Sequence, residues 1–201
     1  MYLFFDTETT GFVRKSLPKD DPLQARVVEL AAILVDKEGK ELDRLHSIIQ
    51  PDGWTVPDRV AQIHGITTER ARVEGRPRLD VLREFEIMSN KAWWFISHNF
   101  AFDNDMMEIE QEFGGFVWIP GRVWCTMKEM TNICKIPNEK RGGYKWPKLQ
   151  ECHKFLFGEE FEGAHGAMAD TLACKRIFFE CLRLGHITVP EITPQKNPVS
   201  E

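Results

Sequence analysis

The chain has 201 residues, of which 42% are hydrophobic and 28% charged, and its net charge is −5. These values are typical of a folded soluble protein and argue against a disordered chain. No apolar run reaches the roughly 20 residues that span a bilayer, so we expect no membrane partner. Because the protein is acidic, any attraction for nucleic acid must be local or must come from bound cations.

Apolar periodicity predicts an α/β protein. Strands are predicted over residues 2–5, 26–36, 45–51, 92–97 and 122–126, with a polar turn at 36–41 forming a hairpin. Helices are predicted within 57–69 (ending at Gly65), over 78–90, 103–113 and 127–135, from Pro147, and over 167–184. This order predicts a five-stranded mixed sheet, with an antiparallel hairpin unit followed by parallel strands joined by helices. Residues 189–201 contain three prolines and read as a tail.

The cysteines indicate the compartment. They are five in number and form no CxxC pair, which predicts a reduced, cytoplasmic setting. The start of the chain has no basic segment of the kind that opens a signal peptide. Cys152 and His153 are adjacent and lack a second pair at zinc-finger spacing, so we expect no zinc site there.

The first predicted strand leads into an acidic pair, Asp6 and Glu8. Residues two apart on a strand share a face, so both side chains point the same way. In open α/β sheets, ligands bind at the carboxyl ends of the strands. Taken alone, however, such a pair is more often a solvated strand end that leads into a loop.

Two later stretches carry further candidate residues. SHNFAFDNDMM places Asp103 at the start of a predicted helix, where a helix N-cap is the alternative role. AHGAMAD places His165 five residues before Asp170. Residues five apart on a helix lie about 140° apart around its axis, so we expect His165 in the loop before the helix and Asp170 in its first turn. The alternative for His165 is a partly buried, hydrogen-bonded histidine.

Together, DTETTG, HNFAFD and AHGAMAD resemble the three exonuclease motifs of the DEDD superfamily, in its histidine-bearing branch. That branch includes the proofreading epsilon subunit of bacterial DNA polymerase III, RNase T and oligoribonuclease. RVVELAAILVD, IIQP and IHGIT also resemble segments of the family, and the likeness covers roughly residues 1–185. The resemblance implies a ribonuclease H-like fold, with residues 1–186 as the exonuclease domain and 187–201 as a proline-containing tail.

The resemblance assigns metal ligation to Asp6, Glu8, Asp103 and Asp170, and the role of general base to His165. Four carboxylates in one pocket repel one another, and two divalent cations would balance their charge. Oxygen ligands favour Mg²⁺ or Mn²⁺ over zinc. Two such ions about 3.5–4 Å apart can stabilise both the attacking and the leaving oxygen at phosphorus. Histidine, with an ordinary pKa near 6.5, can accept the proton of water at neutral pH.

The resemblance also suggests residues that contact the terminal nucleotide or support the site. They are Thr9, Thr10, Phe12, Ile63, His64, His98 and Asn99. Phe12, Ile63 and His64 would border the nucleotide, and the two threonines would bond its sugar. His98 is expected to position the site, whereas His46, His153 and His186 are assigned to the surface or to ordinary packing.

Two loops are candidates for substrate contact. EKRGGYKWPK (139–148) mixes basic and aromatic residues, which can hold phosphates and stack on bases. An equally good interpretation is a solvated loop whose Trp146 packs into the core. FVRKSLPKDDPLQ (12–24) is expected to form a rim over the cleft.

These observations predict a Mg²⁺- or Mn²⁺-dependent 3′–5′ exonuclease that releases nucleoside monophosphates, with the single-stranded 3′ end of DNA as its partner. An exoribonuclease is the alternative within the class. A polymerase-accessory protein, or a nucleic-acid-binding protein that has lost catalysis, is the alternative outside it, and the presence of all four carboxylates argues against lost catalysis. The resemblance implies a DNA polymerase as candidate partner, but the tail lacks the long linker and further domain of a typical epsilon subunit, so we expect no stable partnership.

Overall fold

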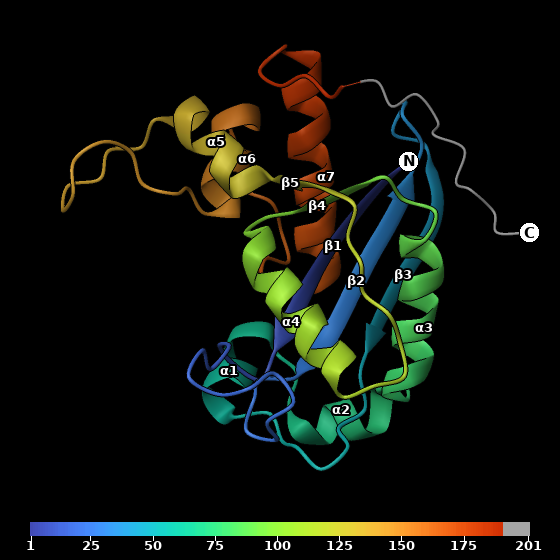
Figure 1. Cartoon of the computed structure of the whole chain (residues 1–201). Coiled ribbons are helices and arrows are strands. Elements are labelled where there is room, and N and C mark those ends of the chain that lie inside the picture. The colour runs from blue at the N-terminus through green and yellow to red at the C-terminus, as the bar shows by residue number, and fades with distance from the viewer. Residues whose placement is uncertain (191–201) are drawn as a thin grey trace, which may run out of the picture.

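The structure, a computed structural model, describes residues 1–190 and contains one five-stranded mixed sheet (Figure 1). Its strands are β1 (Tyr2–Thr9), β2 (Val27–Val35), β3 (Glu41–Ile48), β4 (Trp94–Ser97) and β5 (Arg122–Cys125), in the order β3-β2-β1-β4-β5. β2 runs antiparallel to β1 and β3, whereas β1, β4 and β5 are parallel. The predicted mixed sheet is therefore confirmed.

Seven helices lie in the described residues. They are α1 (Asp58–His64), α2 (Thr68–Glu74), α3 (Arg78–Ser89), α4 (Phe100–Glu112), α5 (Thr126–Cys134), α6 (Leu149–Phe157) and α7 (Ala167–Arg183). Gly65 ends α1 in the left-handed conformation, with φ 74°, as predicted. None of these helices combines the length and the apolar character that crossing a membrane requires.

Several element boundaries differ from the prediction. β1 extends to Thr9, because β2 pairs with it along its whole length. β3 begins at Glu41, four residues early, since an edge strand with one exposed face accommodates charged residues. α4 begins at Phe100, three residues early. α6 begins at Leu149, so Pro147 lies outside the helix that it was predicted to start.

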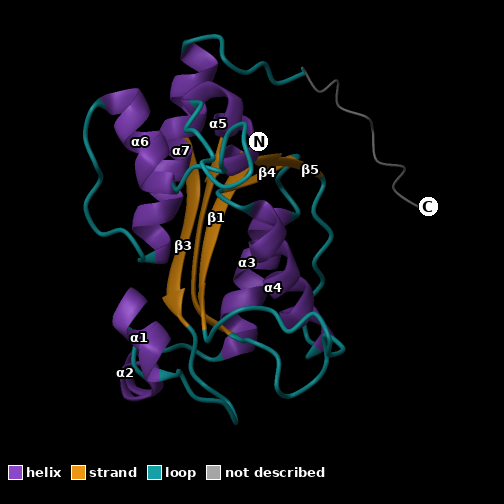
Figure 2. Cartoon of the chain, turned by 90° about the vertical axis from the view of Figure 1, so that its left-hand side faces the viewer, coloured by secondary structure: helices purple, strands orange, loops and turns teal. Residues whose placement is uncertain are grey.

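The two faces of the sheet bury separate clusters. Leu3 and Phe5 of β1 pack with α3 and α4, whereas Phe4 packs with α7. Figure 2 shows α3 and α4 on one side of the sheet and α5, α6 and α7 on the other. The rings of Phe4 and Phe178 have their centroids 5.4 Å apart. Burying one such side chain stabilises the fold by about 1.5–3 kcal/mol. The even-numbered side chains of β1 therefore face α7.

The described chain continues in contact with the core after α7. Ile187 is buried and belongs to the cluster around Phe4 and Phe178, one residue beyond the predicted domain boundary. Residues 191–201 of the predicted tail lie outside the described residues.

The parallel pairing between β1 and β4 is short. It ends at Phe4 and Ile96, while β1 stays paired with β2 as far as Thr9. From Asp6 onward, one edge of β1 therefore has no neighbouring strand, and α4 follows β4 just beyond this point. This divergence opens the carboxyl end of β1 toward the start of α4.

A buried ion pair fixes α4 to the sheet. The carboxylate of Glu110, 1% exposed, accepts bonds from Arg26 Nε at 3.0 Å, from Arg26 Nη2 at 2.9 Å and from the Val27 amide at 3.0 Å. Arg78 Nη1 donates to the Glu110 carbonyl oxygen at 3.1 Å. Because Glu110 lies about two turns after Asp103 on the same helix, this pair also sets the position of Asp103.

Replacing Glu110 with alanine should strongly destabilise the protein, because it leaves the Arg26 guanidinium buried without its partner. We expect a loss of about 3–5 kcal/mol in the free energy of unfolding, measured by urea denaturation. The exposed Glu112 on the same helix provides the control, and Glu112→Ala should change stability by less than about 0.5 kcal/mol. Equal, small effects of both variants would contradict this role of Glu110.

Candidate active site

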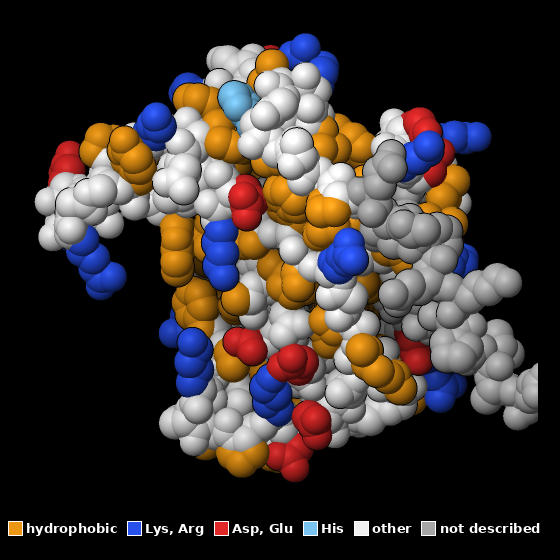
Figure 3. All heavy atoms as spheres, turned by 45° about the horizontal axis from the view of Figure 1, so that its top comes forward, with side chains coloured by type: hydrophobic (Ala, Val, Ile, Leu, Met, Phe, Trp, Pro, Cys, Tyr) orange, Lys and Arg blue, Asp and Glu red, His pale blue; other side chains and the backbone are white. Residues whose placement is uncertain are grey.

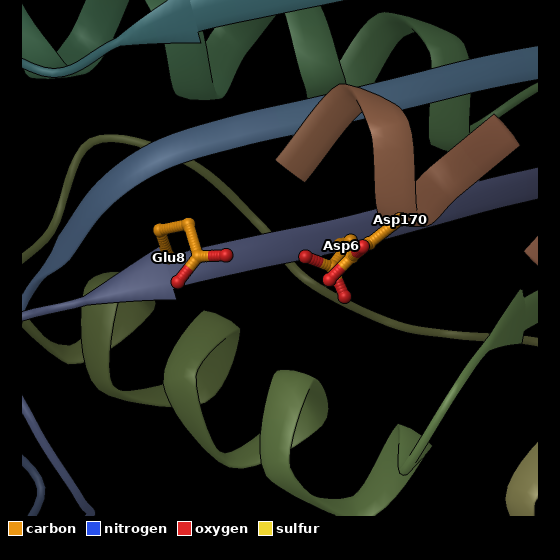
Figure 4. Close-up of side chains that lie close together, drawn as sticks. All are labelled: Asp6, Glu8 and Asp170. Carbon is orange, nitrogen blue, oxygen red and sulfur yellow. The ribbon is translucent and has the colours of Figure 1, made fainter. Parts of the chain in front are cut away.

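Three carboxylates meet at the carboxyl end of β1. Asp6 and Glu8 lie on the face of β1 that is covered by α7, and Asp170 projects from the first turn of α7. One oxygen of each residue lies within 4.8 Å of the others. Figure 4 shows the Asp6 and Asp170 carboxylates side by side, with Glu8 on the same strand pointing toward them. The strand therefore ends in a compact acidic cluster, named here the acidic triad.

Asp103 lies beside the acidic triad and outside it. Its Oδ1 accepts hydrogen bonds from the Thr7 amide at 3.2 Å and the Thr7 hydroxyl at 2.8 Å, and the residue is 2% exposed. Asn99 is the N-cap of α4, so the alternative role of Asp103 as the cap is wrong. The carboxylate instead occupies the edge of β1 that β4 leaves unpaired. The structure thus brings three of the four predicted ligands together. It places the fourth, Asp103, next to Thr7, the residue between the two acids of β1.

The acids have raised pKa values because they are shielded from water and lie close together. Burial, followed by repulsion from Asp103, raises the pKa of Asp6 well above its ordinary value. Burial and then the charge of Asp170 raise the pKa of Glu8 to about 8. Burial raises the pKa of Asp170 to about 6, against a smaller lowering by His165. Burial raises the pKa of Asp103 to about 7, against the hydrogen bonds from Thr7.

The donors of the acidic triad fit a hard divalent cation. All are carboxylate oxygens, which Mg²⁺, Mn²⁺ and Ca²⁺ prefer. Asp170 Oδ1 is buried and has no hydrogen-bond partner within residues 1–190. A buried oxygen in this state is unfavourable unless a cation or a proton satisfies it. Asp6, Glu8 and Asp170 are therefore the residues suited to hold a metal.

His165 lies where its spacing predicted, in the turn before α7. It is exposed and has φ 67°, a left-handed conformation that is uncommon for a residue with a side chain. Gly166 follows as the N-cap of α7, and its carbonyl oxygen accepts from the Asp170 amide at 3.1 Å. His165 and Asp170 therefore lie on one short segment, which consists of the turn before α7 and the first turn of that helix.

Glu29 is a site residue that the sequence motifs did not identify. It lies on β2 directly opposite Glu8 and is 7% exposed. Its Oε2 accepts from the Ala167 amide at 2.9 Å, and His46 Nε2–H donates to its Oε1 at 2.8 Å. It therefore satisfies a free amide at the start of α7 and anchors the helix that carries Asp170. The only available signal was a lone acid within the nine-residue buried strand VVELAAILV.

Both ring nitrogens of His98 are hydrogen-bonded within the protein. Nε2–H donates to the Pro147 carbonyl oxygen at 3.0 Å, and Nδ1 accepts from the Thr126 hydroxyl at 2.9 Å. Burial lowers the pKa of His98 to about 4, so the ring is neutral near pH 7. These contacts fix the orientation of the ring, and the positioning role of His98 stays a prediction. The next residue, Asn99, adopts φ 77° as the chain turns into α4.

The residues predicted at the terminal nucleotide fall into two groups. Thr9 and Thr10 are hydrogen-bonded within the chain: Thr9 Oγ1 donates to the Gly11 carbonyl oxygen at 2.8 Å, and Thr10 Oγ1 accepts from the Arg26 amide at 2.9 Å. Phe12 is 85% exposed and Ile63 is 56% exposed. The threonines therefore shape the turn after β1, whereas the two apolar side chains are open to contact.

His64, the last of these residues, closes α1 and faces the same region as Thr9. Its Nδ1 accepts from the Ile66 amide at 3.1 Å, its Nε2 is buried without a hydrogen-bond partner among residues 1–190, and burial lowers its pKa. A separate pocket of about 270 Å³ lies at the turn after β1, and its lining includes Thr10, Phe12, Arg14 and Arg59. Its lining also includes Arg26, which is paired with Glu110, whereas Arg14 and Arg59 place positive charge at the turn after β1. They belong to the 12–24 loop, which was predicted as a rim, and to α1.

Replacing Glu29 with alanine should loosen the first turn of α7, because the Ala167 amide loses its acceptor. We expect a loss of about 0.5–2 kcal/mol in the free energy of unfolding, together with faster hydrogen exchange in that turn. Glu29→Gln retains a side-chain oxygen and is the matched control, so its exchange should stay close to that of the original protein. Unchanged exchange in Glu29→Ala would show that the bond does not hold the helix end.

The raised pKa values predict that the metal-free protein loses stability as pH rises. Between the ordinary carboxyl value near 4–4.5 and about 8 for Glu8, the folded protein binds more protons than the unfolded chain. The free energy of unfolding therefore falls with rising pH through this window. Thermal melts in EDTA from about pH 5 to about pH 8 should show a falling Tm, and Glu8→Gln should flatten the slope. Parallel slopes for the two proteins would contradict this account.

Comparison with known proteins relates the sequence to a family and the fold to solved structures. The sequence matches the RNase T exonuclease family model over residues 3–178. A search of curated protein sequences gives no match. Crystal structures of E. coli exonuclease I share the fold. The complex with a dA16 oligonucleotide has a TM-score of 0.70 at 21% identity, and the alignment covers 90% of this chain and 40% of that one.

Two further exonuclease I structures agree. The complex with a dT13 oligonucleotide has a TM-score of 0.69 at 22% identity, covering 92% of this chain and 42% of that one. The zinc-bound E. coli exonuclease I–ssDNA complex has a TM-score of 0.70 at 21% identity, covering 90% and 40%. This chain thus spans less than half the length of those proteins, and the likeness confirms the expected ribonuclease H-like fold. From the family match over residues 3–178, the chain belongs to the RNase T family of exonucleases.

Proposed function

We propose that this protein is a metal-dependent 3′–5′ exonuclease of the histidine-bearing DEDD branch, and that it hydrolyses DNA to nucleoside monophosphates. The observation that carries the proposal is the acidic triad, with its oxygens within 4.8 Å, in a chain of an exonuclease family. DNA is favoured because E. coli exonuclease I, which shares the fold, was solved with deoxyoligonucleotides and with ssDNA.

Asp6, Glu8 and Asp170 would hold the catalytic metal, and Asp103 would complete the site for a second ion from the neighbouring edge of β1. Mg²⁺ or Mn²⁺ supplies positive charge that stabilises a phosphate undergoing substitution. The raised pKa values of the triad support this assignment, since a cation allows every carboxylate to ionise.

His165 is the proposed general base. Its imidazole accepts the proton of the attacking water as the water oxygen bonds to phosphorus, and the bond from phosphorus to the preceding 3′ oxygen breaks. His165 is exposed in the turn that leads to Asp170, so it can meet water from the solvent side. Neutral His98, bonded at both nitrogens, cannot take this role without losing one of its contacts.

Phe12 and Ile63 suit the terminal nucleotide. Phe12, which follows β1, exposes an aromatic ring that can stack on the face of a base, and Ile63 of α1 exposes an aliphatic side chain that can pack against one. Arg14 and Arg59, which line the pocket beside Phe12, suit the negative charge of a phosphate. These side chains are the proposed contacts of the terminal nucleotide and its phosphate.

Substitutions at the site should separate metal binding from proton transfer. We expect Asp6→Asn to abolish hydrolysis while the fold persists, because the triad loses a charged ligand. His165→Ala should lower the rate by about 10²–10⁴, the usual contribution of a general base. His186→Ala, an exposed histidine outside the site, is the control and should keep full activity. Rates are measured as nucleotide release with Mg²⁺. Full activity in Asp6→Asn would contradict the assignment of Asp6 as a metal ligand.

The proposed function is tested by digestion of oligonucleotides labelled at the 3′ or the 5′ end. DNA and RNA versions are incubated with Mg²⁺, with Mn²⁺ and with EDTA. The proposal expects early release of the 3′ label as a mononucleotide, a ladder from the 5′ label, faster cleavage of DNA and no cleavage in EDTA. Early loss of the 5′ label would reverse the polarity, and faster cleavage of RNA would identify an exoribonuclease.

A further inference from the structure

The segment between α5 and α6 forms a hairpin that stands away from the body. This segment, residues 136–148, is named the arm, and Figure 1 shows it projecting on the side where α4 begins. Its two sides are joined by hydrogen bonds from Lys145 N–H to Ile136 O at 2.9 Å and from Asn138 N–H to Gly143 O at 2.9 Å. A β-bridge also pairs Pro137 with Tyr144. The arm is therefore a hydrogen-bonded unit with a defined shape.

The surface of the arm is basic and aromatic. Residues 139–148 contain four basic residues and one acidic residue, in a protein of net charge −5. Among the arm's basic side chains in the described part of the chain, only that of Lys145 is in an ion pair, with Glu151. In Figure 3 the arm protrudes at the left and displays Lys or Arg side chains beside hydrophobic ones. Lys140 and Arg141 at its tip are exposed.

Trp146 decides between the two interpretations of this loop. It is 64% exposed, and Tyr144, two residues before it, is 46% exposed. The interpretation in which Trp146 packs into the core is therefore wrong. Two large aromatic rings left open to water beside cationic side chains lose hydrophobic stabilisation in the free protein. The same combination is what a groove for single-stranded nucleic acid uses, with bases stacked on rings and phosphates held by cations.

The base of the arm is joined to the candidate active site. The Pro147 carbonyl oxygen, one residue after Trp146, accepts from His98 Nε2–H at 3.0 Å. His98 lies at the start of the motif that carries Asp103 and leads directly into α4. The hydrogen bond therefore fixes the aromatic end of the arm relative to the segment that brings Asp103 to β1. Figure 2 looks onto the side toward which the arm projects.

We propose that the arm is a second contact for the substrate strand, binding nucleotides upstream of the 3′ end under hydrolysis. Trp146 and Tyr144 stack on bases, and Lys140 and Arg141 neutralise phosphates. This inference rests on the proposed exonuclease function. It adds that affinity depends on strand length and not only on the terminal nucleotide. It also gives an acidic protein a local basic surface for a polyanion, because four of its basic residues lie on one projecting element.

The test compares binding with hydrolysis of a minimal substrate. Affinities of 5′-fluorescein oligothymidylates of about 3, 6, 12 and 20 nucleotides are measured by anisotropy in EDTA, where hydrolysis is suppressed. Trp146→Ala should weaken binding of the longest strand by about 5- to 150-fold, which is the effect of removing one aromatic–base stack. Lys140→Ala/Arg141→Ala should lower the slope of log affinity against log salt by about 1.4, from about 0.7 per lost phosphate contact.

Two matched variants control for general effects. Trp93→Ala removes another exposed tryptophan, which lies before the amino end of β4, and Lys37→Ala/Lys40→Ala removes two exposed cations from the β2–β3 turn. Both should bind the longest strand as the original protein does. Melting temperatures of all variants establish that each is folded.

Hydrolysis of the p-nitrophenyl ester of thymidine 5′-monophosphate with Mg²⁺ separates the two proposals. This substrate is too short to reach an upstream contact, so the arm variants should hydrolyse it at the original rate. If the original protein leaves the ester and oligonucleotides intact, the proposed function fails. If hydrolysis is normal but Trp146→Ala binds the longest strand with unchanged affinity, the arm inference alone fails. It also fails if affinity does not rise with strand length.

Discussion

Repulsion between like charges at the end of β1 is the constraint around which this molecule is organised. Asp6, Glu8 and Asp170 bring oxygens within 4.8 Å where water is partly excluded, and repulsion at such distances grows as the effective dielectric falls. The cluster persists because packing elsewhere holds its carriers, with β1 between two apolar clusters and α7 packed on the sheet. The triad therefore stays compact only with bound protons or cations, and this requirement links its charge state to its chemistry.

Strand β2 positions the site although it carries none of the predicted catalytic residues. Arg26, just before β2, and the amide of Val27, its first residue, bind Glu110 and fix α4, the helix of Asp103. Two residues farther along, Glu29 binds the first amide of α7, the helix of Asp170. Two helices on opposite faces of the sheet are thus held in place by contacts with the same short segment, residues 26–29. A shift of β2 would move both helices together and would change the separation of their carboxylates less than independent movements would.

Local pattern predicted much of this arrangement, and nonlocal contact supplied the rest. Strand alternation placed Asp6 and Glu8 on one face, and helix geometry placed His165 before α7 and Asp170 within it, as the structure shows. The bond of Asp103 to Thr7 depends on where β1 and β4 separate, across 96 residues. The bond of Glu29 to Ala167 spans 138 residues. Such pairings depend on the packing of whole elements, which neither periodicity nor motif spacing encodes.

His165 and Asp170 lie on either side of the start of α7, which the bond between Glu29 and the Ala167 amide holds in place. This arrangement has a consequence for the activity of partly unfolded molecules of the proposed enzyme. If the start of α7 frays, the proposed proton acceptor and a proposed metal ligand leave the site in the same event. A partly unfolded molecule would then be inert and would not act as a nuclease with relaxed selectivity. For a protein proposed to hydrolyse DNA from its ends, losing activity whenever this local structure is lost would protect the DNA of the cell that contains it.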